Sequence, residues 1–467
     1  MSDSSRLDST QVAEDFRRAA HQAVDWIADY LADPREYPVL PAVQPGELTD
    51  RLPQSGPETG EPIERSLEDF QKLILPATTH WNHPGFMAFF GSSASGPGVL
   101  GEMLCAALNT NAMVWKSGPA STELEQTVLG WYRQWLGLPE DFFGVIYDTA
   151  SMSSTHAMAA ARQLADPECR QRGTRSGLTA YISTQTHSSI EKAAIALGIG
   201  QENVRKLEVD DEYRMRPDLL ASAIEQDLAA GRKPFFVTAT VGTTSTTSID
   251  PVPEIADIAE QHGLWLHVDS AYGGAAAIVP ELHHIFKGVD RAQSVVTNPH
   301  KWLFTPSDCS VFYTRRPDML REAFSLIPEY LRTKDHPRAV NLMDYGLQLG
   351  RRFRSLKLWF VMRYFGHQGL QQILRNHVQW AQDLAAQIRA DSRFEIMAPA
   401  PLSVVCFRLR STDEANHRLI DKVNASGKVF LSGTVLKGKY TIRLAIGNIG
   451  TTWADVEQAW NLVKAAI

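Results

Sequence analysis

The run Trp265-Leu266-His267-Val268-Asp269-Ser270-Ala271-Tyr272-Gly273-Gly274 decides the fold class. Its first four residues form a short, mostly apolar segment that predicts a buried strand, and the acid and glycines after them mark the strand's end. Strands that alternate with helices predict an α/β fold with a mostly parallel sheet covered on both faces. Comparable strand-like segments, separated by helix-like ones, occur at residues 144–147, 179–183, 204–207, 235–240, 294–297 and 310–313.

The chain divides into three segments around this pattern. Residues 1–115 contain an amphipathic helix, from about Val12 to Leu31, followed by a proline-rich strap, and we expect this segment to form a dimer. Residues 116–354 hold the sheet and a mobile loop at about 328–345. Residues 355–467 combine helical and strand patterns, which predicts a small α+β domain.

Composition and charge exclude several classes of protein. Hydrophobic residues make up 44% of the 467 and charged residues 21%, as in ordinary globular proteins. The sequence contains 46 Lys and Arg residues and 53 Asp and Glu residues, and the resulting net charge of −7 argues against nucleic acid as a partner. No apolar run approaches the roughly 20 residues that span a bilayer, and the first residues lack the apolar core of a secretory signal. Because the four cysteines include no CxxC pair, we expect reduced thiols and a cytoplasmic protein.

Polar side chains follow five of the predicted strands. The carboxyl ends of parallel strands lie at one edge of a sheet, where ligands of such folds bind. We therefore expect these polar side chains to meet at one site. They are Thr149 and Ser151, His187, Thr244, Asp269, and His300 with Lys301.

These residue types together suit one cofactor. Residues 149–151 open a helix, and the N–H groups and hydroxyls there would bind a phosphate. Lys301, desolvated beside His300 at the mouth of an apolar sheet, would have a lowered pKa and could form an imine. Asp269 could pair with a cationic ring nitrogen. A phosphate cup, an imine-forming lysine and a carboxylate for a ring nitrogen predict pyridoxal 5′-phosphate (PLP).

The motif Asn298-Pro299-His300-Lys301-Trp302, together with the 265–274 run, resembles the group II PLP-dependent decarboxylases, and most closely the aromatic-L-amino-acid decarboxylases. The resemblance extends along nearly the whole chain through Thr79-His80-Trp81, Ser121–Glu125, His187–Glu191 and Leu349–Lys357. It implies a PLP-dependent transferase fold of type I, like that of aspartate aminotransferase. It also implies a homodimer with the active site at the subunit interface. The implied reaction converts tryptophan, tyrosine, phenylalanine or DOPA to the arylalkylamine and CO2.

The resemblance gives each site residue a role. Lys301 would bind PLP as an imine, and Asp269 would pair with the pyridine nitrogen. His187 would stack on one face of the ring and Ala271 would pack on the other. Tyr330, in the mobile loop, would protonate the carbanion that CO2 leaves behind. The phosphate and ring environment would be completed by Thr149, Ala150, Ser151, Thr244, Asn298 and His300.

The substrate pocket implied by the resemblance has aromatic walls, which suit an aromatic side chain. Its members would be Trp81, Phe89, Phe90 and Gly350, with Asn111 and Met113 from the second subunit. Gly350 would leave room for a ring as large as indole. The chain departs from the animal relatives at several of these positions and at the phosphate cup, where Asp148-Thr149 stands for the usual Gly-Ser.

Three alternatives remain open. The first is an aromatic aldehyde synthase, in which decarboxylation is coupled to oxidative deamination, and the presence of Tyr330 and His187 favours decarboxylation instead. The second is a catalytically silent scaffold protein with a PLP fold, which the combination of Lys301, Asp269 and His187 disfavours. The third is an aminotransferase, which the order of the motifs disfavours.

Two further clusters have structural interpretations. His80 and His83 lack an acid or cysteine spaced with them, so we expect packing and no metal site. The basic cluster Arg351, Arg352 and Arg354 is interpreted as ion pairs near the active site or a dimer contact, because the net charge disfavours a nucleic-acid partner.

Overall fold

The computed structural model describes residues 9–175, 177–326 and 338–467, and its main feature is a seven-stranded sheet in the order β1-β7-β6-β5-β4-β2-β3. Strands β2 to β6 run parallel to their neighbours among themselves, whereas β7 is antiparallel to both β1 and β6. This confirms the predicted α/β fold with a mostly parallel sheet. The strands are β1 Phe143–Tyr147, β2 Leu178–Ser183, β3 Val204–Leu207, β4 Lys233–Thr240, β5 Trp265–Asp269, β6 Ser294–Thr297 and β7 Ser310–Thr314.

Helices cover both faces of this sheet because successive strand residues point to opposite sides. On β1, Val145 packs into a core with α6, α8 and α12, whereas Ile146 packs into a second core with α5, α9, α10 and the first half of α13. Both strand residues are fully buried. These helices are α5 Pro119–Trp135, α6 Ala150–Ala165, α8 Ser189–Ala196, α9 Pro217–Ala229, α10 Val252–His262, α12 Pro317–Phe324 and α13 Ser355–Ala390.

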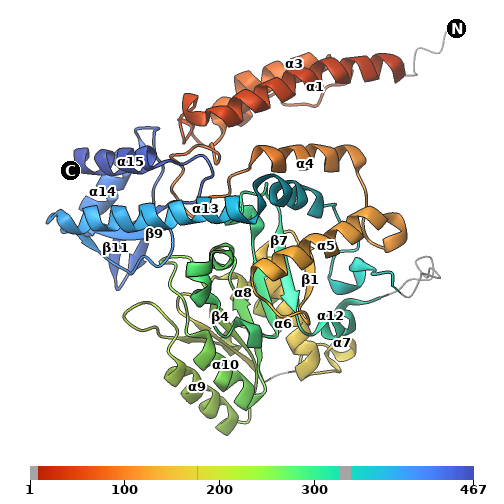
Figure 1. Cartoon of the computed structure of the whole chain (residues 1–467), viewed down its shortest axis with the longest axis vertical. Coiled ribbons are helices and arrows are strands. Elements are labelled where there is room, and N and C mark those ends of the chain that lie inside the picture. The colour runs from red at the N-terminus through yellow and green to blue at the C-terminus, as the bar shows by residue number, and fades with distance from the viewer. Residues whose placement is uncertain (1–8, 176, 327–337) are drawn as a thin grey trace.

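The C-terminal part forms a smaller antiparallel sheet in the order β10-β11-β9-β8. Helix α13 passes from the large core to the small one: Leu358 packs under the large sheet, and Ala381 packs with the small one. The helix is interrupted at Gly366, which has a positive φ of 63°. Figure 1 shows α13 running across the molecule toward the small sheet. The small domain also contains β8 Phe394–Ile396, β9 Val404–Leu409, β10 Ser432–Leu436, β11 Lys439–Ala445, α14 Asp413–Asn424 and α15 Trp453–Ala465.

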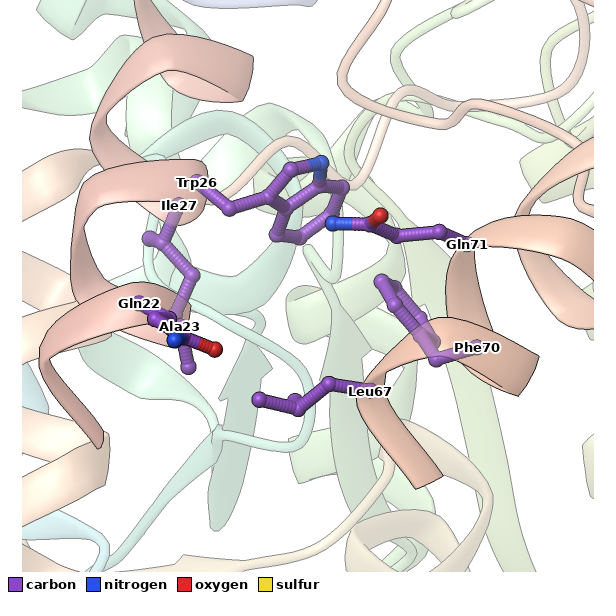
Figure 2. A pocket seen from close by; sticks show the side chains of 7 residues that line it. All are labelled: Gln22, Ala23, Trp26, Ile27, Leu67, Phe70 and Gln71. Atoms are coloured by element: carbon purple, nitrogen blue, oxygen red, sulfur yellow. The ribbon is translucent and has the colours of Figure 1, made fainter. Parts of the chain in front are cut away.

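The first helices of the N-terminal segment stand apart from the sheets, whereas its later residue Met87 packs into the core of the small sheet. Helix α1, Ser9–Ala32, ends before Asp33 and Pro34, as predicted, and packs against α3, Ile63–Asp69. Figure 1 shows this pair of helices separated from the main body. A hollow of about 260 Å³ lies between them, and Figure 2 shows Trp26 and Ile27 of α1 facing Leu67 and Phe70 across it. Its lining carries no ionisable side chain, so this hollow belongs to the packing of the N-terminal helices.

No helix within residues 9–175, 177–326 or 338–467 is long and apolar enough to cross a bilayer.

Further helices complete the described part of the chain. The remaining α-helices are α2 Glu47–Arg51, α4 Gly96–Leu108, α7 Cys169–Arg172 and α11 Pro299–Trp302.

Candidate active site

A cleft of about 210 Å³ lies where the central parallel strands end, and it gathers most of the residues singled out in the sequence. Its lining comes from the ends of β4, β5 and β6 and from the starts of α6 and α8. The expected convergence of strand ends on one site is therefore found. The predicted site residues that line the cleft are Phe90, Thr149, Ala150, Ser151, His187, Thr244, Asp269, Ala271, Asn298, His300 and Lys301.

One end of the cleft is suited to an anion. Helix α6 begins there, and Thr149 caps it by accepting a hydrogen bond from the Met152 N–H at 3.4 Å. His300 accepts the Cys309 N–H at Nδ1, at 2.9 Å, and burial lowers its pKa to about 4. The imidazole is therefore neutral near pH 7, with its remaining proton on Nε2 as a hydrogen-bond donor. A helix N-terminus and a neutral N–H donor together favour a phosphate.

The reactive amine lies next to this anion site. Lys301 is in α11, directly after β6, and its backbone N–H donates a hydrogen bond to the Asn298 carbonyl at 2.9 Å. Its Nζ lies 5.0 Å from the centre of the Phe90 ring. Burial lowers the pKa of Lys301, and the carboxylate of Asp269 opposes that shift. A lysine held in this way has a larger share of neutral, nucleophilic amine than one in water.

Asp269 and His187 define the rest of the polar lining. Asp269 ends β5, is 5% exposed, and accepts the Ala271 N–H at 3.0 Å. His187 accepts the Ser189 N–H at Nδ1, at 3.2 Å, and burial lowers its pKa. Its neutral form therefore carries the proton on Nε2. The cleft thus contains one carboxylate, one amine and two neutral imidazoles.

Close backbone packing shapes the floor of the cleft. A Cβ added to Gly273 would lie 2.4 Å from the Val241 carbonyl oxygen, so only glycine lets the turn after β5 rest against the end of β4. Thr240, Gly242 and Tyr272 also line the cleft, and none of them is among the residues predicted for the site. Gly242 and Tyr272 lie within two residues of the assigned Thr244 and Ala271, and that proximity is the signal that could have identified them. Thr240 is the last residue of β4, four positions before Thr244.

The residues of the cleft fit PLP. Two of its lining side chains, Asn298 and Thr240, have a buried oxygen with no hydrogen-bond partner within the described ranges. Buried polar atoms of this kind ordinarily have a partner, so the cleft calls for a polar ligand. The helix N-terminus at one end, the amine of Lys301 and the carboxylate of Asp269 match the phosphate, the aldehyde and the ring nitrogen of PLP.

Other predicted residues do not line the cleft. Trp81 and Phe89 stack with ring centres 6.2 Å apart and remain 41% and 52% exposed. Asn111 accepts the Arg351 N–H at 3.0 Å and lies beside Gly350. The Met113 carbonyl accepts the Met343 N–H at 3.0 Å. Tyr330 and most of the predicted loop at 328–345 lie outside the described residues.

The basic cluster forms ion pairs, as interpreted from the sequence. Arg351 pairs with Glu125 at 2.6 Å and both are buried, whereas Arg354 pairs with Asp308 at 2.8 Å. Arg352 pairs with Glu102. The Arg351 guanidinium also donates to the Ile146 carbonyl on β1, two residues before the phosphate cup begins, so this pair fixes the strand that leads into the cleft.

A type I α/β fold with a lysine, a carboxylate and a helix N-terminus around one cleft defines a PLP-dependent enzyme. The chain belongs to the pyridoxal-dependent decarboxylase family, whose conserved domain matches residues 45–410. Tyrosine decarboxylase 2 of Narcissus pseudonarcissus is 42% identical over 97% of this chain and 94% of its own length. Phenylacetaldehyde synthase of Arabidopsis thaliana is 41% identical over 97% of this chain and 96% of its own length.

A solved structure confirms the fold assignment. The crystal structure of Oryza sativa TDC with PLP and tryptamine matches with a TM-score of 0.94 and 37% sequence identity. The match covers 97% of this chain and 98% of that chain. The chain is therefore a PLP-dependent carboxy-lyase with the predicted type I fold.

Proposed function

We propose that this protein decarboxylates an aromatic L-amino acid, namely tryptophan, tyrosine, phenylalanine or DOPA, to the arylalkylamine and CO2. One observation carries the proposal. In a chain of the pyridoxal-dependent decarboxylase family, Lys301, Asp269 and the α6 N-terminus line one cleft, and Phe90 forms an aromatic wall beside the amine. The names of the relatives at about 40% identity support the aromatic substrate class.

Each residue of the cleft has a separate role in the proposed reaction. The α6 N-terminus, Asn298 and His300 would hold the phosphate, and the carboxylate of Asp269 would favour a protonated ring nitrogen. When bound, PLP supplies a ring that accepts the electron pair left when CO2 departs. Lys301 contributes a neutral amine, and the Nε2–H of His187 provides a donor at the cofactor ring. Thr244 and Ala271 line the same cleft and would bound the space for the ring.

The substrate side chain packs against the aromatic wall formed by Trp81, Phe89 and Phe90. Stacking on such rings contributes roughly 1 kcal/mol beyond the area it buries. Two of these rings are exposed to solvent in the single chain, so the pocket needs a cover. We propose that Asn111 and Met113 of a second subunit supply it, and that Gly350 leaves room for the substrate ring.

The proposed assembly is a homodimer. Helix α1 exposes Val12 at 48% and Phe16 at 65%, and α4 exposes Leu100 at 49% and Leu108 at 61%. Apolar faces of this kind on two helices mark an interaction surface. A symmetric copy of the chain is the commonest partner for such a surface, and it would cover both helices. A cytoplasmic location remains a prediction from the sequence.

An aldehyde synthase is the second candidate, because phenylacetaldehyde synthase is as similar to this chain as the decarboxylases are. The two reactions differ in their products: the decarboxylase releases amine and CO2, whereas the synthase consumes oxygen and water and releases CO2 with aldehyde, hydrogen peroxide and ammonia in place of the amine. The test incubates the PLP-loaded protein with each of the four amino acids and measures all of these products. Amine and CO2 in equal amounts support decarboxylation. Peroxide and ammonia at the level of CO2 would contradict it.

A further inference from the structure

An arginine next to the cleft has no part in the function proposed above. Arg443 lies on β11 of the small domain and is 3% exposed. No carboxylate of the described residues pairs with it, and its Nη2 is buried without a hydrogen-bond partner among them. A buried guanidinium ordinarily faces a carboxylate, because an unpaired charge away from water is costly. The presence of an unpaired guanidinium at this buried position therefore needs an explanation.

The contacts of Arg443 join two walls of the site. Its Nε donates to the Ser245 carbonyl at 3.2 Å, and its Nη1 donates to the Phe89 carbonyl. Its guanidinium carbon lies 4.7 Å from the centre of the Phe90 ring. Ser245 follows Thr244 at the end of the cleft, and Phe89 belongs to the aromatic wall of the proposed substrate pocket. One side chain of the small domain therefore fixes two segments of the cofactor and substrate site.

The same ring connects Arg443 with Lys301. The Lys301 Nζ lies 5.0 Å from the Phe90 centre, and Phe90 itself stacks on Tyr272 with centres 3.9 Å apart. Tyr272 stacks in turn on Trp302, the residue after the lysine, at 4.6 Å. Because Lys301 and Arg443 both contact the Phe90 ring, this stack of rings fixes the position of one cation relative to the other.

The other ionisable groups facing Lys301 do not neutralise both cations. Asp269 is the one carboxylate among the described residues that line the cleft. His187 and His300 line it too, and burial favours the neutral form of each. The site therefore contains two buried cations and one carboxylate, and that carboxylate is also the partner proposed for the ring nitrogen.

We propose that Arg443 is a positioning residue of the active site: it fastens Phe89 and Ser245 around Phe90, and it keeps an unneutralised positive charge beside Lys301. The inference rests on the proposed role of Lys301 as the residue that binds PLP. The positive charge disfavours a second positive charge on the lysine nitrogen. Burial is the main influence that lowers the pKa of Lys301, and Arg443 acts in the same direction.

The test compares three variants of the PLP-loaded protein by following its visible imine absorbance as a function of pH. Arg443→Met removes the charge, and we expect the pKa of the imine nitrogen to rise by roughly one unit. Arg443→Lys keeps the positive charge, so we expect the pKa of the imine nitrogen to shift by less than half as much. Because lysine cannot bind both carbonyls, we also expect a raised KM for the aromatic amino acid. Arg408→Met is the matched control. Arg408 is 4% exposed on neighbouring β9 but pairs with Asp413 at 2.8 Å, and we expect no shift.

A second measurement separates this inference from the proposed function. In protein stripped of PLP, the rate at which an amine-reactive label modifies Lys301 is measured against pH by mass spectrometry. The label reports the pKa of Lys301 whether or not this lysine binds PLP. An unchanged pKa in Arg443→Met, or an equal shift in Arg408→Met, would overturn the inference. Absence of the imine band in the wild type, with the labelling shift intact, would instead overturn the proposed role of Lys301.

Discussion

At the scale of single residues, burial decides which groups of the site carry charge. It lowers the pKa of both histidines and of Lys301, so the nitrogen bases of the cleft are shifted toward their neutral forms. The sequence indicated this for Lys301, because a lysine at the mouth of an apolar sheet is desolvated. The role of Arg443 was not predicted, because its segment has the pattern of an ordinary strand and its two hydrogen-bond acceptors, Ser245 and Phe89, lie more than 150 positions away in the sequence.

Tyr330 gives a prediction at this scale that rests on the resemblance. Tyr330→Phe removes the hydroxyl assigned to protonate the carbanion, so we expect amine formation to fall by roughly a hundredfold, within the range for loss of a general acid. The share of oxidised product should rise. The matched control is Tyr364→Phe, since Tyr364 lies on α13 and is 73% exposed. A product ratio identical to that of the wild type would remove Tyr330 from this role.

The cysteines give a second prediction. Cys309 and Cys406 are buried, and burial raises the pKa of each thiol to about 12. Only the thiolate reacts readily, so neither cysteine should react with a thiol reagent near pH 8 while the protein is folded. Mass spectrometry after brief labelling checks this, with the protein unfolded in denaturant as the control. Labelling of either cysteine at the rate seen in denaturant would contradict it.

At the scale of elements, the strands of the large sheet were predicted within two residues of their observed ends, because each is a short apolar segment with a clear turn after it. In the small domain, the sequence pattern predicts a strand at residues 440–446, which corresponds to β11, but it does not predict β10. Ser432–Leu436 is an edge strand with an exposed Val435, so its alternation is weak. The Lys437-Gly438 pair, with φ of 49° and 73°, is a two-residue turn that could have revealed it. The helical pattern predicts residues 370–389 as a helix, so it covers the second part of α13 and misses the first part.

The loop between β4 and α10 gives a prediction for pH. Asp250 is fully buried and accepts the Thr240 and Met215 N–H groups, both at 2.7 Å, and burial raises its pKa to about 7. The unfolded chain loses this proton near pH 4, so the native state binds more protons between about pH 4 and 7. Stability therefore falls as pH rises through that window, by a total on the order of 4 kcal/mol from this group.

Replacing Asp250 isolates that contribution. Asp250→Asn cannot ionise, so the wild-type Tm should fall relative to that of the variant between about pH 5 and pH 8. The control is Asp211→Asn, since the Asp211 side chain is 99% exposed, and we expect no such change. Parallel pH profiles for the wild type and Asp250→Asn would show that Asp250 does not titrate in this window.

At the scale of the whole molecule, the single chain leaves apolar faces of α1 and α4 and the rings of Trp81 and Phe89 in water. The sequence indicated this, because an amphipathic helix and a strap cannot bury their own apolar face. It could not specify the contacts of the proposed dimer, because they depend on surfaces that only the folded chain creates. The same limit applies to the choice among the four aromatic amino acids.

Phe16→Glu tests the assembly. Placing a charge on the exposed face of α1 should weaken the dimer, so we expect a monomer at micromolar concentration with at least tenfold lower decarboxylase activity. The control is Leu228→Glu on α9, where Leu228 is 49% exposed and belongs to the large domain. Sedimentation of both variants beside activity measurements distinguishes them. A fully active Phe16→Glu monomer would show that one chain suffices.

The most direct test of the account is the position of the cofactor on the chain. Reduction of the PLP-loaded protein with borohydride fixes the imine as a stable amine, and peptide mapping by mass spectrometry then locates it. The account predicts the phosphopyridoxyl group on Lys301 and its loss, together with amine production, in Lys301→Ala. Attachment to a different lysine, or amine production that survives Lys301→Ala, would contradict it.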